Sequence, residues 1–217
     1  MGKPLLVVGS KHKSSWSLRP WLAMKVAGVD FEEKVVLLDR ADTKALIKPH
    51  SPTGKVPVLV HDDVTVWESL SICEYVAETW APTLWPADKK ARALARSVSN
   101  EMHAGFSALR NACSMDMQAD HRGMTLSPDA GGDVHRIGQI WRTCRERFGS
   151  ADNSGGPFLF GAFTIADAMY APVVTRFVTY GIPADSIGAA YMDAVQALPA
   201  FQEWKAAALK EPHAAPR

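Results

Sequence analysis

Cysteine is scarce in this chain of 217 residues. The three cysteines, Cys73, Cys113 and Cys144, lie far apart and form no CxxC pair, which argues against a disulfide framework and against a zinc site. Free thiols suit a reducing compartment. We therefore expect a cytoplasmic protein whose core forms without disulfides and without a bound metal.

Excess charge and long apolar runs are also missing. The chain has 24 Lys and Arg against 23 Asp and Glu, a net charge of +1, so it offers no strong field to hold nucleic acid or an anionic membrane surface. No apolar run reaches the length of a membrane span, and the apolar part of the N-terminus is too short for a signal peptide. Neither nucleic acid nor a membrane is therefore expected as a partner.

The first 80 residues alternate short apolar runs with amphipathic ones, which predicts an α/β domain. We expect strands at residues 5–8, 33–38, 57–60 and 64–67, and helices at 16–27, 41–48 and 69–79. The resulting order β-α-β-α-β-β-α implies a mixed sheet.

The rest of the chain predicts helices and no convincing strand. Pro82 and Pro86 mark a linker at residues 81–88. Beyond the linker, we expect a loop at 121–132 and helices at 89–118, 133–148, 164–180 and roughly 189–209. The predicted organisation is therefore an α/β domain at 1–80 and an all-helical domain at 89–217.

Two serines precede the first expected helix. Ser14 and Ser15 stand where serine commonly caps a helix by accepting a hydrogen bond from a free backbone N–H. The same position favours an anion, because a helix N-terminus carries free N–H groups and a partial positive charge. A hydroxyl there could also donate to a thiolate, so capping and thiolate activation both remain open.

Val56-Pro57 lies at the start of the third expected strand. An ordinary strand-edge proline with a trans bond is the simpler interpretation. A cis bond would instead turn the Val56 N–H and C=O outward, where they could pair with an extended peptide ligand as an added strand does.

Glu68 and Ser69 begin the helix expected at 69–79. They can serve as a cap and as an acid favoured by the helix dipole. Alternatively, Ser69 and the helix N-terminus can hold a carboxylate while Glu68 holds an ammonium, so that the pair binds one amino acid headgroup.

Thr164 and Asp167 match a capping box at the start of another helix, with Asp in place of the commoner Glu or Gln. We assign this pair a structural role.

Four segments in this order resemble the glutathione transferase superfamily: residues 14–19, 54–59, 68–72 with Tyr75, and 163–167. The resemblance covers essentially the whole chain. It implies a thioredoxin-like α/β domain followed by an all-α helical bundle domain, and it implies a homodimer.

Within that superfamily the thiol-activating residue is Tyr, Ser or Cys. The first tyrosine here is Tyr75 and the first cysteine is Cys73, both too late to follow the first strand. The run Ser-Ser-Trp-Ser-Leu-Arg at 14–19 resembles the Ser-Ser-Cys-x-x-Arg pattern of the zeta class, with Trp16 in place of the cysteine. A serine-type, zeta-like member that resembles a bacterial subgroup is therefore favoured over a thiol-transferring one.

The resemblance implies glutathione as co-substrate, with Ser14 donating to its sulfur and Ser15 as the competing donor. It implies that Val56 binds the cysteinyl backbone, that Glu68 and Ser69 bind the γ-glutamyl end, and that Lys55 or Lys44 meets the glycyl carboxylate. The full set of expected glutathione-binding residues is Ser14, Ser15, Trp16, Arg19, Lys44, Lys55, Val56, Pro57, Glu68 and Ser69.

The second substrate is expected between the two domains. The segment from Met102 to Met117 is rich in residues that suit an adaptable apolar pocket, although such a stripe is more often core. Within it the candidate pocket residues are Met102, His103, Phe106, Arg110 and Asn111.

These features predict an enzyme that conjugates the glutathione thiolate to a small apolar electrophile. A glutathione-dependent cis-trans isomerase of the maleylacetoacetate type is an alternative, against which the replacement of the zeta cysteine by Trp16 counts. A non-catalytic dimeric binding module with the same fold is the third possibility.

Overall fold

The N-terminal part of the chain forms a four-stranded mixed sheet. The computed structural model describes residues 2–149 and 155–212. Its strands are β1 (Leu5–Gly9), β2 (Glu32–Val36), β3 (Val58–His61) and β4 (Val64–Trp67), in the order β2-β1-β3-β4. β1 runs parallel to β2 and antiparallel to β3, and β3 pairs with β4 in an antiparallel hairpin. The mixed sheet expected from the sequence is thus confirmed.

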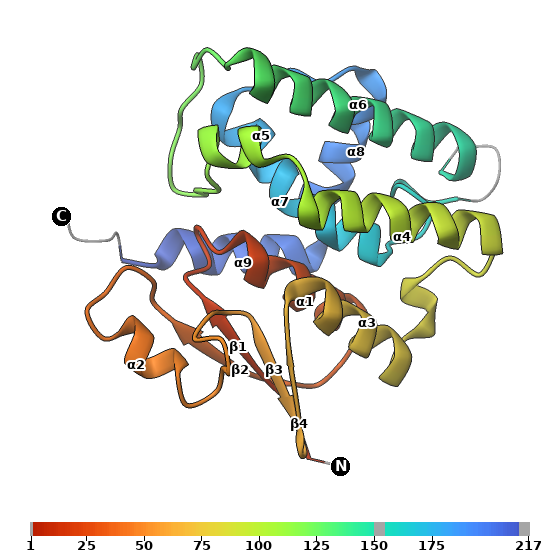
Figure 1. Ribbon diagram of the computed structural model, residues 1–217. Helices are drawn as coiled ribbons and strands as arrows, with labels where there is room; N and C mark the ends of the chain where they lie inside the picture. Colours follow the sequence, from red (N-terminus) through yellow and green to blue (C-terminus); the bar gives the residue numbers. More distant parts are fainter. Residues whose placement is uncertain (1, 150–154, 213–217) are drawn as a thin grey trace.

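Side chains of β1 point alternately to the two faces of the sheet, and each face is covered by helices. Leu6 and Val8 belong to the main core together with α1 (Ser15–Val26) and α3 (Ser69–Thr79). Val7 lies in a smaller cluster on the other face, with Ile47 of the short helix α2 (Thr43–Ile47). Figure 1 shows α1 and α3 between the sheet and the helical part of the molecule.

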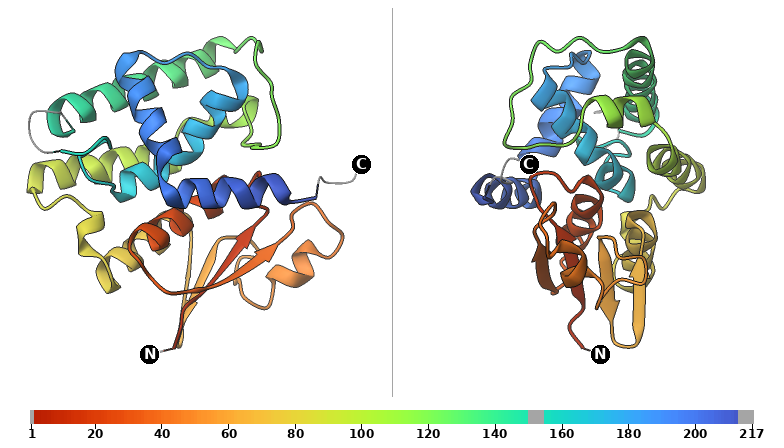
Figure 2. Two further views of the ribbon diagram at one scale, coloured as in Figure 1. Left: turned by 180° about the vertical axis from the view of Figure 1, so that it is seen from behind. Right: turned by 60° about the vertical axis from the view of Figure 1, so that its left-hand side comes forward.

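The remainder of the described chain is helical and is built around α7 (Ile165–Tyr180). Almost every side chain of α7 is buried, since α1 and α4 pack against it. The other elements are a 3-10 turn at Pro82–Leu84, α4 (Lys89–Ala104), α5 (Ser107–Ala112), α6 (Pro128–Phe148), α8 (Ser186–Ala197) and α9 (Pro199–Lys210). Figure 2 shows that α9 returns to lie beside α1, so the end of the described chain lies next to the sheet domain.

Three helix boundaries predicted from the sequence were wrong. The expected helix at 89–118 breaks after α4, because Gly105 is extended and Phe106 adopts a left-handed φ of 57°. The loop expected at 121–132 ends earlier, because Ser127 accepts a hydrogen bond from the N–H of Ala130 and Pro128 occupies the first turn of α6. The helix expected near 189–209 divides before Pro199, which cannot donate a helical hydrogen bond and instead starts α9.

The segment before α1 is held by α9 and by the residue that follows it. The indole N–H of Trp204 donates to the carbonyl of Lys11 at 2.8 Å. The carboxylate of Glu211 accepts from the backbone N–H groups of Lys11 and His12 at 2.7 and 3.0 Å. The chain that leads into Ser14 is therefore fixed by contacts from about 200 residues further along the sequence.

Candidate functional site

A cavity of about 300 Å³ opens where the N-termini of α1 and α3 approach the loop before β3. Its wall combines residues from three parts of the N-terminal domain with one residue of α5. The lining residues are Trp16, Thr53, Lys55, Val56, Pro57, Trp67, Glu68, Ser69 and Arg110. Six of these, from Trp16 to Ser69, were expected to bind glutathione, and Arg110 was expected in the second-substrate pocket. Pockets of this size hold small organic ligands.

The bond between Val56 and Pro57 is cis, in agreement with the less common of the two interpretations of this dipeptide. The preceding loop is tied by Ser51, whose hydroxyl donates to the carbonyl of Lys55 at 2.8 Å. Val56 is half-buried and Pro57 is buried, and both lie on the wall of the cavity directly before β3.

The start of α3 contains a polar group that has no partner in the protein. Glu68 is the N-cap residue, with a φ of 66°, and it makes no side-chain cap. Ser69 is the first helical residue, and its Oγ is buried without a hydrogen-bond partner among the described residues. The interpretation of Ser69 as a cap was therefore wrong. A buried hydroxyl without a partner costs free energy unless a ligand or water satisfies it, and this one lies in the wall of the cavity.

Ser14 occupies the N-cap position of α1, but its hydroxyl does not cap the helix either. The hydroxyl donates instead to Ser17 Oγ at 2.8 Å, and Ser17 Oγ accepts in turn from the Gly9 N–H at 3.0 Å. The Ser15 hydroxyl has no hydrogen bond within the described part of the chain. Both serines are buried at the N-terminus of α1, and neither is among the residues that line the cavity.

Two guanidinium groups contact the ring of Trp16. The Cζ atoms of Arg19 and Arg110 are 4.2 and 4.8 Å from the centre of its ring, and His103 contacts the ring edge-on at 5.3 Å. Each such cation–π contact contributes about 0.5–2 kcal/mol, depending on burial. The indole of Trp16 therefore joins α1 to α4 and α5.

Arg19 is completely buried. Its Nε donates to the carbonyl of Met169 at 3.1 Å, but its Nη1 has no hydrogen-bond partner among the described residues. Burial, followed by the nearby guanidinium groups of Arg176 and Arg110, holds the pKa of Arg19 well below its ordinary value. Arg110 and Arg176 also donate to backbone carbonyls rather than to carboxylates. These three side chains form a cationic group beside the cavity, and such a group favours an anion.

The other residues that were expected to bind glutathione or the second substrate do not line the cavity together. Lys44 is exposed on α2 and does not line the cavity. His103 Nε2 lies 3.8 Å from the Glu68 carboxylate, and burial lowers the pKa of His103. Met102 and Phe106 pack in the hydrophobic core, and Asn111 is exposed. The apolar stripe of this segment is thus core, which was the more common of its two interpretations.

Thr53 and Trp67 line the cavity although the sequence did not single them out. Trp67 ends β4, and its side chain is 43% exposed. Its position immediately before Glu68 was the feature of the sequence that could have indicated its place in the cavity wall. Among the described residues, no group of three or more His, Cys, Asp or Glu could hold a metal ion.

Comparison with known proteins decides the family. Residues 13–79 match the family model of the glutathione S-transferase N-terminal domain, and residues 98–207 match that of the glutathione S-transferase C-terminal domain. The chain belongs to the glutathione S-transferase family. The predicted thioredoxin-like domain followed by a helical domain is thereby confirmed.

Several curated proteins resemble this glutathione S-transferase family member over part of its length. The probable maleylacetoacetate isomerase of Caenorhabditis elegans is 38% identical over 110 residues, which are 50% of each chain. Glutathione S-transferase U16 of Arabidopsis thaliana is 37% identical over 103 residues, which are 46% of this chain and 44% of that protein. The chain therefore spans about half the length of the curated relatives it matches.

Solved structures of the family match over nearly the whole chain. A glutathione transferase homologue from Burkholderia GL BGR1, crystallised with bound glutathione, has a TM-score of 0.69 and 27% identity, and the match covers 94% of this chain and 96% of that one. An epsilon-class glutathione S-transferase from the housefly, Musca domestica, has a TM-score of 0.72 at 20% identity, and the match covers 96% of this chain and 94% of that one. At this identity the match supports the fold alone.

Proposed function

We propose that this family member is a glutathione transferase that conjugates the thiolate of glutathione to a small apolar electrophile. The observation that carries the proposal is the buried, unpartnered Oγ of Ser69 in the wall of a cavity at the N-terminus of α3. The helix N-terminus and this hydroxyl together suit a carboxylate, because both offer hydrogen-bond donors. The Burkholderia homologue, crystallised with bound glutathione, supports the choice of ligand.

In this proposal the two ends of glutathione bind to different parts of the cavity. Ser69 and the first turn of α3 hold the γ-glutamyl carboxylate, and Glu68, whose side chain is 57% exposed, holds the γ-glutamyl ammonium. Val56 pairs its backbone with the cysteinyl residue, as an added strand would. Lys55 lines the cavity and is the better candidate than Lys44 for the glycyl carboxylate.

Thiolate formation is assigned to the N-terminus of α1. Free N–H groups and the partial positive charge of the helix lower the pKa of a nearby thiol. The cationic group of Arg19, Arg110 and Arg176 acts in the same direction. Ser14 is our proposed donor to the sulfur, and this requires its hydroxyl to turn from Ser17 toward the ligand. Catalysis then consists of positioning the nucleophile and stabilising its charge.

Replacing Ser69 with alanine is expected to raise the dissociation constant of glutathione by roughly tenfold to a hundredfold, since a hydrogen bond to a charged group contributes about 1.5–3 kcal/mol. The turnover number at saturating glutathione should change little, because the headgroup lies away from the sulfur. Calorimetric titration together with steady-state rates separates the two effects. Ser71→Ala, an exposed serine on the same helix, is the matched control. An unchanged dissociation constant in the Ser69 variant would remove the headgroup assignment.

Isomerisation of an acidic substrate is a second candidate function, and the cationic group favours it. Arg110 lines the cavity beside Trp16. Arg19 and Arg176 donate hydrogen bonds to backbone carbonyls and not to carboxylates, so their charges are not neutralised by these partners. Such a group suits a substrate that carries its own carboxylates. The resemblance to the Caenorhabditis elegans protein named probable maleylacetoacetate isomerase supports this alternative.

Arg110→Met distinguishes the two candidates. If the second substrate carries a carboxylate, kcat/KM for that substrate should fall by about tenfold or more, because a charge-assisted hydrogen bond is lost. The kcat/KM for a neutral aryl halide should stay within about twofold, since no such bond exists there. Equal losses with both substrates would show that Arg110 acts through Trp16 and glutathione, and would argue against an acidic substrate.

We also propose a homodimer, a location in the cytosol, and a domain division at residues 80 and 89. The outer strand β4 supports the dimer, since Val64 and Trp67 are 40% and 43% exposed and an open strand edge invites a partner. None of the described helices is long and apolar enough to cross a bilayer. Residues 213–217, which the proposed division includes in the second domain, lie outside the described part of the chain. Light scattering coupled to gel filtration tests the dimer.

A further inference from the structure

The turn at residues 10–14 connects β1 to Ser14, the proposed donor to the glutathione sulfur. The backbone N–H of Ser14 donates to the carbonyl of Ser10 at 2.8 Å, and the N–H of Lys13 donates to the same carbonyl at 3.2 Å. The Ser10 hydroxyl accepts from the N–H of Leu38 at 2.8 Å, which ties the start of the turn to the N-terminal domain. The position of Ser14 therefore depends on the backbone of the residues that lie between Ser10 and Ser14.

The backbone groups of two of these residues, Lys11 and His12, are all hydrogen-bonded to the C-terminal part of the chain. The Lys11 N–H donates to the Glu211 carboxylate at 2.7 Å, and its carbonyl accepts from the Trp204 indole N–H at 2.8 Å. The His12 N–H donates to Glu211 at 3.0 Å, and its carbonyl accepts from the Met117 N–H at 2.9 Å. Because the helical domain and the residue after it satisfy these groups, they also set the conformation of the turn.

Glu211, which directly follows α9, makes the largest number of these contacts. Its side chain is only 11% exposed, and its carboxylate also accepts from the imidazole Nδ1 of His12 at 2.7 Å. A carboxylate accepts hydrogen bonds and donates none, so His12 Nδ1 carries the proton. Two successive backbone N–H groups and one imidazole N–H thus converge on a single carboxylate, and hydrogen bonds to an ionised acceptor are among the stronger ones in proteins.

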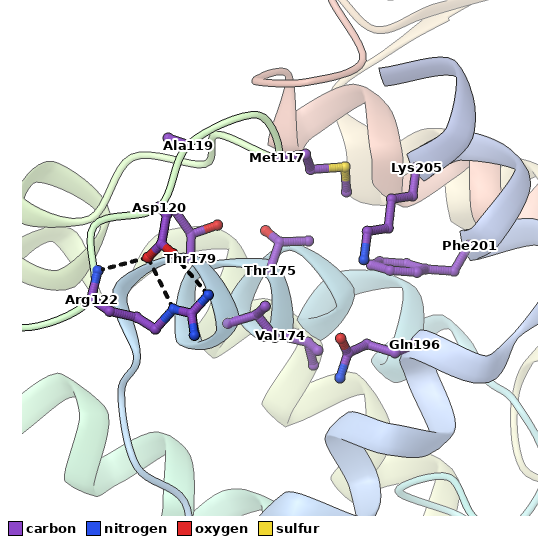
Figure 3. Close-up of a pocket in the computed structure, with 11 residues that line it drawn as sticks. Met117, Ala119, Asp120, Arg122, Val174, Thr175, Thr179, Gln196, Phe201 and Lys205 are labelled. Atoms are coloured by element: carbon purple, nitrogen blue, oxygen red, sulfur yellow. Dashed lines mark hydrogen bonds and ion pairs between the residues drawn. The ribbon is translucent and has the colours of Figure 1, made fainter. Parts of the chain in front are cut away.

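The segment between α5 and α6 holds Glu211 in place. Gln118 Nε2 donates to the carbonyls of Ala208 and Glu211 at 2.9 and 2.8 Å. The side chain of the preceding residue, Met117, lines a cavity of about 110 Å³ beside α9 (Figure 3). Since the N–H of Met117 also bonds to His12, the turn, this segment and the end of α9 form one connected group.

We propose that Glu211 is a positioning residue for thiolate formation, whose carboxylate fixes the turn at residues 10–14 so that the Ser14 hydroxyl is directed at the glutathione sulfur. The inference rests on the proposed function, since it concerns the same contact between Ser14 and the sulfur. Glu211 does not line the cavity assigned to glutathione, and it acts through the backbone of Lys11 and His12. A displacement of about 1 Å at a catalytic group can cost about a hundredfold in rate.

Glu211→Gln keeps the size of the side chain and replaces one acceptor oxygen by an NH₂ group, which cannot accept from the turn. The pKa of the bound glutathione thiol is expected to rise by about one unit, and kcat/KM at neutral pH to fall by about tenfold as the thiolate is lost. The dissociation constant of S-methylglutathione, which has no thiol to ionise, should stay within about twofold. Ultraviolet titration of the thiolate, steady-state rates and calorimetry measure the three quantities.

The direction of the pKa change distinguishes positioning from two other effects of Glu211. A negative charge near a thiolate disfavours it, so removing that charge would lower the thiol pKa if Glu211 acted by its charge alone. A merely structural contact would lower the free energy of unfolding and leave the thiol pKa of the folded protein unchanged. Trp204→Phe is a second variant, because it removes the hydrogen bond to the Lys11 carbonyl and keeps an aromatic ring. It should also raise the thiol pKa.

Glu203→Gln is the matched control, since Glu203 joins α9 to Lys25 of α1 at 2.8 Å and not to the turn. Its thiol pKa and its kcat/KM should equal those of wild type. An unchanged or lowered thiol pKa in the folded Glu211 variant would overturn the proposal, and so would an equal rise in the Glu203 variant.

Hydrogen exchange tests the turn in the absence of glutathione. The amide hydrogens of Lys11 and His12 should exchange at least about tenfold faster in the Glu211→Gln variant than in wild type, because they lose their acceptor. Equal exchange rates would show that the turn holds without Glu211 and would overturn the proposal. Failure of the proposed function would appear in wild type, as a bound thiol with the pKa of free glutathione, and would remove this inference as well. Failure of this inference alone appears only as the lack of a difference between wild type and variant.

Discussion

Ser14→Ala is expected to lower kcat/KM for conjugation at neutral pH by about a hundredfold. Removal of one donor that stabilises a developing or resident anion typically costs about 10²–10³ in rate. If the Ser14 hydroxyl supplies that bond, the pKa of the bound thiol should rise by about two units, equivalent to roughly 2.7 kcal/mol. The thiolate would then be a minor species at neutral pH, and the nucleophile would be lost in proportion.

The shape of the pH profile distinguishes this mechanism from general damage. A raised thiol pKa moves the rate profile to higher pH, so the wild type and the variant should converge once both thiols are ionised. The direct measurement is the ultraviolet absorbance of the bound thiolate as a function of pH. Ser15→Ala is the matched control, since both serines are buried at the same helix N-terminus.

The same experiment distinguishes two alternatives, which are Ser15 as the donor and a protein without catalytic activity. Ser14 has an internal partner, Ser17, whereas the Ser15 hydroxyl has none within the described residues. A thiol pKa that rises only in the Ser15 variant would therefore move the donor role by one residue. An unshifted pKa in wild type, or the absence of glutathione binding, would leave a non-catalytic binding module as the function of this fold.

The sheet domain was predictable because its signals are local. Apolar runs of four or five residues separated by amphipathic segments define β1, α1 and the β3–β4 hairpin, and α3 was predicted with the bounds the structure has. Errors occurred in the helical domain. Phe106 takes a left-handed φ there, which no propensity of phenylalanine predicts.

The chemistry of the site was less predictable than its residues. At both helix N-termini capping was one of the two interpretations of the sequence, yet neither Ser14 nor Ser69 caps its helix. The difference arises from side-chain direction, which depends on packing and not on residue type. Likewise, Trp16 lies against Arg110, 94 positions further along the chain, and no periodicity could have paired them.

Asp167→Ala is expected to destabilise the fold by about 3–5 kcal/mol, a large part of the 5–15 kcal/mol that typically holds a protein folded. Asp167 is completely buried in the first turn of α7, the central helix of the helical domain. Its Oδ1 accepts from the Leu159 N–H at 3.0 Å, and its Oδ2 accepts from the N–H and the hydroxyl of Thr164 at 2.8 and 2.9 Å. Alanine would leave three donors buried without partners, each costing about 1–3 kcal/mol.

The stability lost in the Asp167 variant should also depend on pH, and the direction of that dependence follows from the raised pKa of Asp167. Burial raises that pKa to about 6, despite the hydrogen bonds from Leu159 and Thr164 that oppose the shift. The folded state therefore binds the proton more tightly than the unfolded state, whose Asp has a pKa of about 3.9. This contribution is fully present below about pH 4 and is lost as the pH rises through 6, so the gap between wild type and variant should widen as the pH falls over that window.

Urea unfolding of both proteins across this range measures the gap. Asp193→Ala, an exposed aspartate on α8, should stay within about 0.5 kcal/mol of wild type at every pH. A loss as small in the Asp167 variant would mean that water satisfies the three donors. A gap that narrows as the pH falls would mean that the ionised carboxylate is the stabilising form, and that hydrogen bonding from Leu159 and Thr164 outweighs the cost of burying its charge.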